Sequence, residues 1–170
     1  MILRYVISVL ASLLADFLNL FLAPLVVLFA SKEGWLPSWL WWFQTPDNSL
    51  DGDKGWKAKV KPGYISRVRW LWRNSMYGFA ISVLGVKWKP TDRIETEGNP
   101  KISNRPLVEG LVVRKVYRDS KVIYFQWYYV KAWSSTRCIR INLGWKLWGD
   151  SPTGQLVFSP NPCMGYIKRD

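Results

Sequence analysis

The chain changes character after its first 31 residues. From Tyr5 to Ala30, 26 consecutive residues contain no Lys or Arg, and almost all of them are apolar. As a helix this stretch would measure about 39 Å, which is enough to cross the hydrocarbon core of a bilayer. We expect a retained membrane helix that is kinked at Pro24, so that a full span and a shallower bent insertion are both allowed. A cleavable signal peptide fits less well, because the stretch is too long and Leu28-Phe29-Ala30 is a poor cleavage site.

One side of this predicted helix is small and polar. Six small or polar residues fall on an arc about 140° wide at helical spacing. They are Ser8, Ala11, Ser12, Ala15, Asp16 and Asn19. An ionised carboxylate at bilayer depth costs about 2.5 to 3.5 kcal/mol, so Asp16 needs a compensating environment. We predict that the stripe is a helix-association face for another membrane helix or a second copy of the chain. Alternatively, Asp16 is protonated or extends toward the head groups.

Tryptophans cluster directly after the apolar stretch. Trp35, Trp39, Trp41 and Trp42 stand within eight positions, in a chain that has twelve tryptophans. Tryptophan is enriched where one side of the ring meets lipid and the other meets water, so we predict a belt at the membrane interface. A short buried helix would use the same residues, and only their exposure separates the two interpretations.

An acidic, turn-rich segment follows at residues 45–53. It carries Asp47, Asp51 and Asp53 in an otherwise cationic region, and its composition predicts a loop. As a calcium loop it lacks the glutamate needed at the twelfth position, where Ala58 stands, so a metal site is only a weak candidate. A local turn network is one alternative. The other is a structural latch in which these acids pair with arginines of the following predicted helix, namely Arg67, Arg69 and Arg73.

The rest of the chain predicts one helix and several strands. Residues 64–86 fit a helix, and their uncharged run 75–86 would cover about 18 Å, which is too short to span a membrane. Residues 89–106 predict a surface loop. β-branched and aromatic residues predict strands at 111–117, 122–130 and 137–143, an edge strand at 155–159, and a hairpin turn at Asp119-Ser120.

These elements predict an α+β fold. We expect an N-terminal hydrophobic membrane helix, then a small domain with one amphipathic helix packed on an antiparallel sheet of three to four strands. The expected organisation is a membrane anchor at 1–31, a Trp-rich interfacial segment with the acidic loop at 32–60, and a small basic domain at 61–170. Cys138 and Cys163 are expected to be free thiols, although a single bridge is the alternative if this part faces an oxidising compartment.

The charge balance favours an anionic partner. The net charge is +12, and 23 of the 24 Lys and Arg follow residue 31. Phospholipid head groups, nucleic acid or an acidic protein would all fit. For nucleic acid, the predicted strands offer aromatic rings for stacking and cations for phosphates. These candidates are Tyr124, Trp127, Tyr128, Tyr129, Lys131, Arg137 and Arg140.

Much of catalytic chemistry is missing from the sequence. The chain has no histidine, which excludes His-based nucleophile triads, His general bases and the common His-containing zinc sites. It also lacks a phosphate-binding P-loop, a Gly-rich dinucleotide turn and a G-x-S-x-G elbow. We therefore expect no catalytic residues, no cofactor and no enzymatic activity.

Two stretches resemble a family of uncharacterised small proteins of tailed bacteriophages and prophages. They are Trp35-Leu36-Pro37 through Trp42-Phe43-Gln44-Thr45-Pro46-Asp47-Asn48-Ser49-Leu50-Asp51-Gly52-Asp53 to Trp56, and Arg69-Trp70-Leu71-Trp72-Arg73-Asn74 to Tyr77-Gly78-Phe79. Weaker similarity continues through Asn142-Leu143-Gly144-Trp145. The resemblance implies a phage origin and supplies no activity and no functional residues.

Three functions follow from these observations. The first is a non-enzymatic binding protein at the host inner membrane that acts on another protein. The second is a virion component that meets a membrane during assembly or genome delivery, and the third is a nucleic-acid-binding module. The basic excess after the anchor favours a cytoplasmic C-terminal domain.

Overall fold

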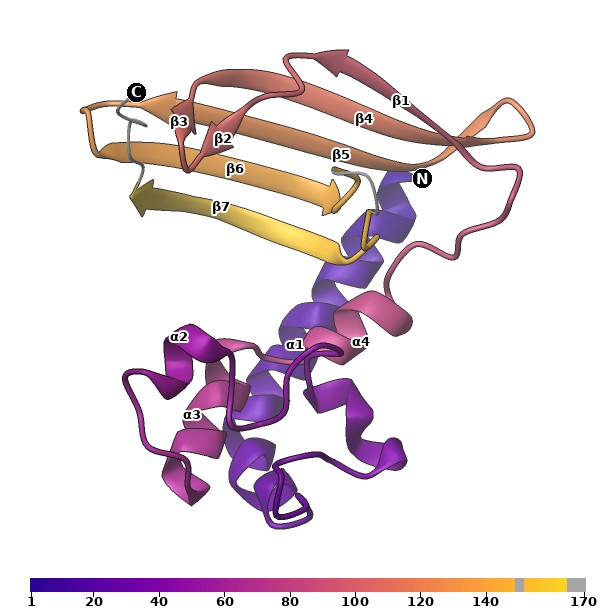
Figure 1. Cartoon of the computed structure of the whole chain (residues 1–170). Coiled ribbons are helices and arrows are strands. Elements are labelled where there is room, and N and C mark those ends of the chain that lie inside the picture. The colour runs from indigo at the N-terminus through magenta and orange to yellow at the C-terminus, as the bar shows by residue number, and fades with distance from the viewer. Residues whose placement is uncertain (149–151, 165–170) are drawn as a thin grey trace. The chain divides into compact units, whose positions relative to one another are not determined.

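The computed structural model describes residues 1–148 and 152–164, which fold into two compact units (Figure 1). One unit, which we call the sheet unit, combines Met1–Val6 with the chain from Gly85 onward. The other, the helical unit, is Ile7–Leu84. The first helix runs through Ile2–Val27 and therefore contributes residues to both units.

The helices are short after the first one. They are α1 (Ile2–Val27), the 3-10 helix η1 (Ser38–Phe43), α2 (Lys54–Lys57), α3 (Tyr64–Arg73) and α4 (Tyr77–Ser82). The prediction of one continuous helix over 64–86 is wrong, because α3 ends at a cap. The capping residue Asn74 has φ of −116° and ψ of 46°, and its side-chain amide donates to the Trp70 carbonyl at 3.1 Å. Met76 adopts a left-handed backbone with φ of 44°. Neither conformation continues a right-handed helix.

The core of the helical unit lies between the end of α1 and α3. Its buried members are Ala23, Val26, Val27, Leu40, Leu50, Val68, Trp70 and Leu71. The expected packing of the 64–86 helix on the sheet is therefore wrong for α3, which belongs to the helical unit and buries its apolar side against α1.

The strands confirm the predicted α+β class. They are β1 (Arg93–Gly98), β2 (Ser103–Asn104), β3 (Leu107–Val108), β4 (Gly110–Arg118), β5 (Lys121–Ala132), β6 (Arg137–Trp145) and β7 (Leu156–Met164). The main sheet is antiparallel in the order β1-β4-β5-β6-β7, and β2 pairs with β3 in a separate hairpin. The turn at Asp119-Ser120 is also confirmed, with φ of 49° and 61° at its two residues, as tight hairpin turns require.

The sheet has five strands instead of the expected three or four. The additional strand is β1, and the prediction of a surface loop over 89–106 is wrong at this point. β1 is an edge strand with the sequence RIETEG and is mostly exposed, so its side chains carry no apolar alternation. Backbone pairing with β4 and the Lys115–Glu97 ion pair at 2.7 Å hold it in place.

Cross-strand partners define the two faces of the sheet. Direct partners lie on the same face, as Arg114 and Gln126 do across β4 and β5. This face, which we call the Arg114 face, is covered by β2, β3 and the residues before them, with its core formed by Ile102, Val112, Tyr128, Val130 and Cys138. The opposite Trp127 face carries Val113, Trp127, Tyr129, Ile139, Ile141 and Leu143, which alternate with the residues of the Arg114 face.

The first turn of α1 is part of the sheet unit. Tyr5 is 9% exposed, and its hydroxyl donates to the Val157 carbonyl at 2.9 Å. Its ring meets those of Phe125 and Trp145 edge-on, with centroids 5.2 and 5.5 Å away. Arg4 donates to the Tyr124 hydroxyl at 2.8 Å. These contacts tie the start of α1 to the sheet.

Candidate functional site

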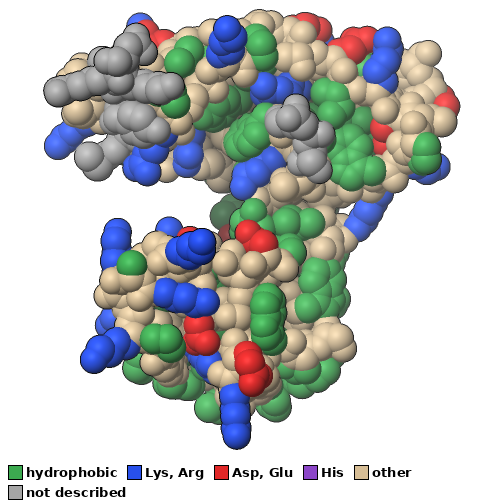
Figure 2. All heavy atoms as spheres, viewed as in Figure 1, with side chains coloured by type: hydrophobic (Ala, Val, Ile, Leu, Met, Phe, Trp, Pro, Cys, Tyr) green, Lys and Arg blue, Asp and Glu red, His purple; other side chains and the backbone are tan. Residues whose placement is uncertain are grey.

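The outer surface of α1 is apolar along its length. Only 17% of its most hydrophobic window of 18 residues is buried, whereas the core helix of a soluble protein would be mostly buried. Large apolar side chains stay exposed, and Figure 2 shows such side chains on the surface of the helical unit. On α1 they are Ile2, Leu3, Val6, Ile7, Leu10, Leu13, Leu14, Phe17, Leu18, Leu20, Phe21, Leu22 and Leu25. A helix of this length and composition is able to cross a membrane.

The polar stripe of α1 faces inward. Asn19 is 1% exposed, and its side-chain amide donates to the Leu71 carbonyl at 3.0 Å and to the Ser75 hydroxyl at 2.9 Å. The half-buried Asp16 carboxyl lies near the Ser75 side chain. Among the other members, Ser8 is buried, and Ser12 and Ala15 are half-buried. At Asp16 and Asn19, the predicted association face therefore contacts the chain's own helical unit.

Two side chains of α3 hydrogen-bond the backbone around Pro24. Proline lacks an N–H, so it leaves the carbonyl of Leu20, four residues earlier, without its helical donor. The Trp72 indole donates to that carbonyl at 3.2 Å, and the Tyr64 hydroxyl donates to the Pro24 carbonyl at 3.0 Å. Exposed backbone groups are costly in lipid, and these bonds satisfy them within the protein. A proline inside an apolar helix signals that such donors are needed, although it does not identify them.

The Trp-rich segment is folded but exposed. Trp35, Trp39, Trp41 and Trp42 are 45, 63, 38 and 44% exposed, while Leu40 between them is buried in the core of the helical unit. The alternative of a buried helix therefore does not describe these four rings. The Trp39 ring meets that of Phe29 edge-on, with centroids 5.3 Å apart. This contact joins the exposed rings to the end of the apolar segment.

The acidic loop contacts α3 through one of its three carboxylates. Asp51 accepts from Nε of Arg67 at 2.7 Å and from Nη2 at 3.1 Å, and the two side chains are only 14% and 16% exposed. Arg67 also donates to the carbonyls of Ser31 and Lys32, at 3.1 and 2.7 Å. One guanidinium thus connects the end of the α1 region, the acidic loop and α3.

The other predicted latch residues have different surroundings. Asp53 caps α2 by accepting from the Trp56 backbone at 2.7 Å, and the guanidinium of Arg73 lies over the ring of Trp56 at 5.5 Å. Asp47 acts electrostatically on Tyr77, whose pKa is raised first by burial and then by that carboxylate. Arg69 has no ion pair within the described residues. The same part of the chain contains no group of three or more acidic, Cys or His side chains able to hold a metal, so Asp47, Asp51 and Asp53 do not converge on one.

The structure divides the nucleic-acid candidates between the two faces of the sheet. Tyr124, Tyr128 and Arg140 belong to the Arg114 face, where both tyrosines are buried. The remaining four belong to the Trp127 face by strand alternation: Trp127, Tyr129, Lys131 and Arg137. The rings of Trp127 and Tyr129 stack on each other at 5.7 Å. The seven side chains therefore do not form one stacking platform.

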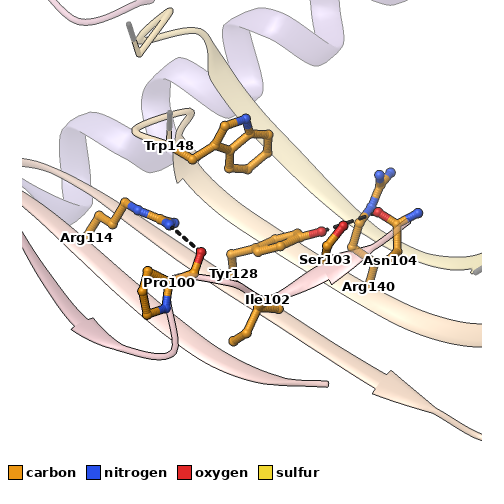
Figure 3. Close-up of a pocket in the computed structure, with 8 residues that line it drawn as sticks. All are labelled: Pro100, Ile102, Ser103, Asn104, Arg114, Tyr128, Arg140 and Trp148. Atoms are coloured by element: carbon orange, nitrogen blue, oxygen red, sulfur yellow. Dashed lines mark hydrogen bonds between the residues drawn. The ribbon is translucent and has the colours of Figure 1, made fainter. Parts of the chain in front are cut away.

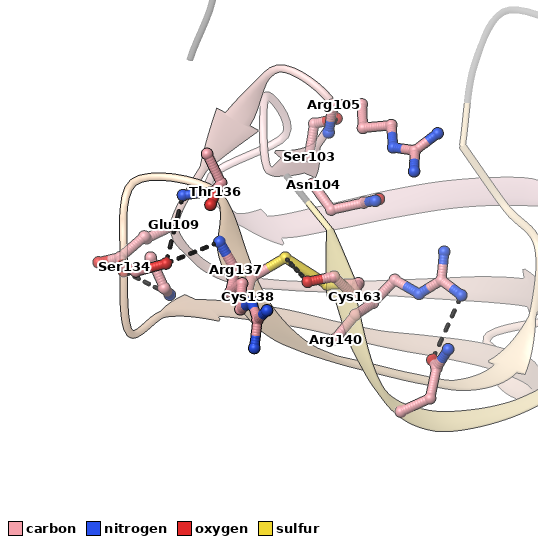
Figure 4. The surroundings of a disulfide bond; sticks show 12 residues. Ser103, Asn104, Arg105, Glu109, Ser134, Thr136, Arg137, Cys138, Arg140 and Cys163 are labelled. Carbon is pink, nitrogen blue, oxygen red and sulfur yellow. Dashed lines mark hydrogen bonds between the residues drawn. A yellow bond between two sulfur atoms is a disulfide. The ribbon is translucent and has the colours of Figure 1, made fainter. Parts of the chain in front are cut away.

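The two cysteines are joined in a disulfide, so the expectation of free thiols is wrong (Figure 4). Cys138 on β6 is the direct cross-strand partner of Cys163 on β7, with Cα atoms 5.1 Å apart. Their sequence separation of 25 residues was uninformative, because pairing depends on a strand register that the sequence alone did not give.

Fold and surface together define a small basic α+β protein with one exposed apolar helix. The chain belongs to the family of unknown function DUF7338, whose model matches residues 1–168. The match covers nearly the whole chain and assigns no activity. No curated protein and no solved structure matches the chain.

Proposed function

We propose that this protein is a non-enzymatic, membrane-held binding protein of tailed bacteriophages and prophages that acts on a host or phage protein at the inner membrane. The observation that supports it best is the reversed polarity of α1. Its large apolar side chains point outward, whereas Asn19 is enclosed with its amide bonded to the helical unit. A soluble protein places these groups the other way round, because an exposed apolar surface of this extent is unfavourable in water.

The membrane contact combines α1 with its aromatic surroundings. Trp35, Trp39, Trp41 and Trp42 are exposed beyond the end of α1, and the indole of Trp72 satisfies a backbone carbonyl within it. Together they form a surface with an apolar body and a polar rim, which is suited to phospholipid. A second copy of the chain, or another membrane protein, would bind through the same exposed side of α1.

Fractionation tests this function. We expect full-length protein to sediment with membranes, to resist salt and to be released by detergent. Leu14→Gln with Phe21→Gln, both on the exposed side of α1, should move a substantial fraction to the supernatant. The matched control is Phe158→Gln, which changes a similarly exposed residue of β7 and should leave the distribution unchanged. Wild-type protein that stays monodisperse in the supernatant without detergent would overturn the proposal.

Two alternative functions predict different results. A virion component would be found by mass spectrometry of purified particles, whereas a protein acting only in the host membrane would not. A nucleic-acid module would bind oligonucleotides with a steep salt dependence. The paired rings of Trp127 and Tyr129 would be its contact surface, and their joint replacement by alanine would abolish that binding.

Orientation in the membrane is also testable. The basic excess favours a cytoplasmic sheet unit, whereas a disulfide persists in oxidising compartments and favours the opposite side. Labelling of intact cells with a maleimide reagent, before and after reduction by an impermeant reductant, distinguishes the two. Cysteines that become labelled only after reduction lie outside the cytoplasm, and cysteines labelled only after cell lysis lie inside.

A further inference from the structure

The Arg114 face of the sheet carries a cavity of about 400 Å³ that is partly open to solvent (Figure 3). Strands β4, β5 and β6 contribute Arg114, Tyr128 and Arg140, and Asn104 of β2 and Trp148 after β6 complete the polar and aromatic lining. All of these residues belong to the sheet unit. None of the described residues that line the cavity is acidic.

Arg114 is a buried charge without a carboxylate partner in the part of the chain that the structure describes. It is only 7% exposed, and its guanidinium donates to the Gln126 side-chain carbonyl at 3.3 Å and to the Pro100 carbonyl at 3.4 Å. Both acceptors are neutral, and both distances are longer than is usual for such bonds. Removing a guanidinium from water without a counter-charge is unfavourable, so the Arg114 guanidinium would gain from a negatively charged ligand.

Arg140 is only partly buried, and it too has no carboxylate partner among the described residues. Its Nη2 donates to Ser159 at 3.2 Å and to Asn161 at 3.3 Å, which are again neutral groups. Its Nε is buried and has no hydrogen-bond partner within the described residues. By contrast, Arg67 and Arg118, whose side chains are 16% and 21% exposed, each have an aspartate at 2.7 Å. These two guanidinium groups thus have a carboxylate partner that Arg114 and Arg140 lack among the described residues.

The cations around this cavity act on one another and on their neighbours. Burial and the nearby charge of Arg140 lower the pKa of Lys146, which follows β6. Burial raises the pKa of Tyr128, and the charges of Arg140 and Arg114 oppose that rise. Both guanidinium groups therefore lie close enough to the Tyr128 hydroxyl to influence it. A positive potential is concentrated in one partly enclosed space.

We propose that this cavity binds a phosphate monoester, with Arg114 and Arg140 contacting the phosphate oxygens and Tyr128 and Asn104 supplying further hydrogen bonds. Two guanidinium groups that have only neutral acceptors among the described residues match two negative charges, and a phosphate monoester carries about −1.5 to −2 at neutral pH. A carboxylate carries only one. Guanidinium groups also suit phosphate geometry, because they donate two parallel hydrogen bonds. Trp148 offers a ring against which the organic part of the ester packs.

Titration calorimetry with full-length protein in detergent micelles tests the site, using glycerol 3-phosphate as the probe. We expect saturable binding that weakens from pH 7.5 to pH 5, since the second phosphate pKa is about 6. Glycerol should not bind, and glycerate, a monoanion, should bind more weakly. Arg114→Gln and Arg140→Gln should each weaken binding by roughly 10- to 100-fold. Arg137→Gln, on the same strand as Arg140 but on the other face, should leave it unchanged.

A further variant separates binding from folding. Arg114→Met removes the buried charge but keeps much of the side-chain volume, so the melting temperature of the ligand-free protein should stay equal or rise while phosphate binding is lost. A lower melting temperature with binding retained would mean that Arg114 is structural. That result, or an absence of binding by wild-type protein, would overturn the proposal. Equal losses in the Arg137→Gln control, or binding of an oligonucleotide alone, would also overturn it.

The same titration identifies the source of the phosphate. Nanodiscs containing phosphatidate present the monoester as a lipid head group, whereas phosphatidylcholine nanodiscs do not. If phosphatidate nanodiscs abolish the response to glycerol 3-phosphate, the site binds a lipid head group. If the response is the same in both nanodiscs, the site binds a soluble phosphate monoester. Either outcome supports the cavity as a phosphate site.

Discussion

The Asp51–Arg67 ion pair should be among the larger single contributors to the stability of the helical unit. Exposed ion pairs contribute about 0 to 1 kcal/mol, whereas breaking a buried pair costs about 3 to 5 kcal/mol. These side chains are 14% and 16% exposed and joined by two hydrogen bonds, so they lie between the limits and closer to the buried one. We expect Asp51→Asn to lower the free energy of unfolding by about 2 kcal/mol.

The expected cost becomes a shift that thermal unfolding can measure. For a chain of this length, about 2 kcal/mol corresponds to a decrease in melting temperature of roughly 4 to 8 °C. The measurement is intrinsic tryptophan fluorescence of the full-length protein in detergent, because Trp56 and Trp70 lie in the helical unit. Arg67→Lys should also be destabilising, since lysine cannot serve both Asp51 and the Ser31 and Lys32 carbonyls with the same fork geometry.

The matched control is an exposed ion pair of the same protein. Arg93 and Glu95 are 3.0 Å apart, but their side chains are 67% and 40% exposed. Glu95→Gln should therefore shift the melting temperature by at most about 2 to 4 °C. High salt should weaken this control pair more than the Asp51–Arg67 pair. If Asp51→Asn had no larger effect than Glu95→Gln, the reasoning from burial would be refuted.

Three further predictions concern other contacts. Asn19→Leu removes a buried hydrogen-bonding amide and should raise hydrogen exchange in α3 without releasing the protein from membranes, and unchanged exchange would contradict this role. The pKa of Asp92 is lowered mainly by its hydrogen bonds from Arg118, so the ionised carboxylate stabilises the folded protein near neutral pH. This stabilisation is lost as the pH falls from about 5 through the folded pKa of Asp92. Asp92→Asn should therefore reduce the loss of stability with pH in that range, and a variant whose acid unfolding matches wild type would contradict this role. Cys163→Ser removes a disulfide whose cysteines are 25 residues apart and should lower the free energy of unfolding of the sheet unit by about 3 kcal/mol. Chemical unfolding under non-reducing conditions measures this change, which should equal that of fully reduced wild-type protein. An unchanged free energy of unfolding would refute the prediction.

The positions of strands whose apolar residues alternate with polar ones could be predicted from the sequence. In β6 the residues Ile139 and Ile141 alternate with polar positions, and the strand formed where that pattern predicted it. The pattern gave the wrong buried face, because Cys138 and Asn142 are buried whereas Ile139 is 37% exposed. The edge strand β1 could not be predicted, because it gains its stability from backbone pairing with β4 rather than from burial of its own side chains. The end of α3 at Asn74 was also missed, since a side-chain cap competes with helix continuation only when tertiary packing permits it.

Candidate sites were harder to predict than elements. The stripe on α1 was found by helical spacing, but its partner was assigned to a different helix rather than to Leu71 and Ser75 of the same chain. The three acids and three arginines proposed for the latch allow nine pairs, and the sequence alone could not select Asp51–Arg67 from them. The cavity at Arg114 left no sequence signal, because it depends on cross-strand register and on the excursion through β2 and β3.

The division of α1 between the two units restricts how the chain can be threaded through a membrane. The chain leaves the sheet unit after Val6 and returns to it at Gly85, so both points lie on the same side of any bilayer. The number of crossings between them must therefore be even. One crossing by α1 would require a second on the way back, and the uncharged run 75–86 covers only about 18 Å as a helix. Under the proposed membrane function, these lengths favour zero crossings, with α1 lying in one leaflet and the N-terminus in the same compartment as the sheet.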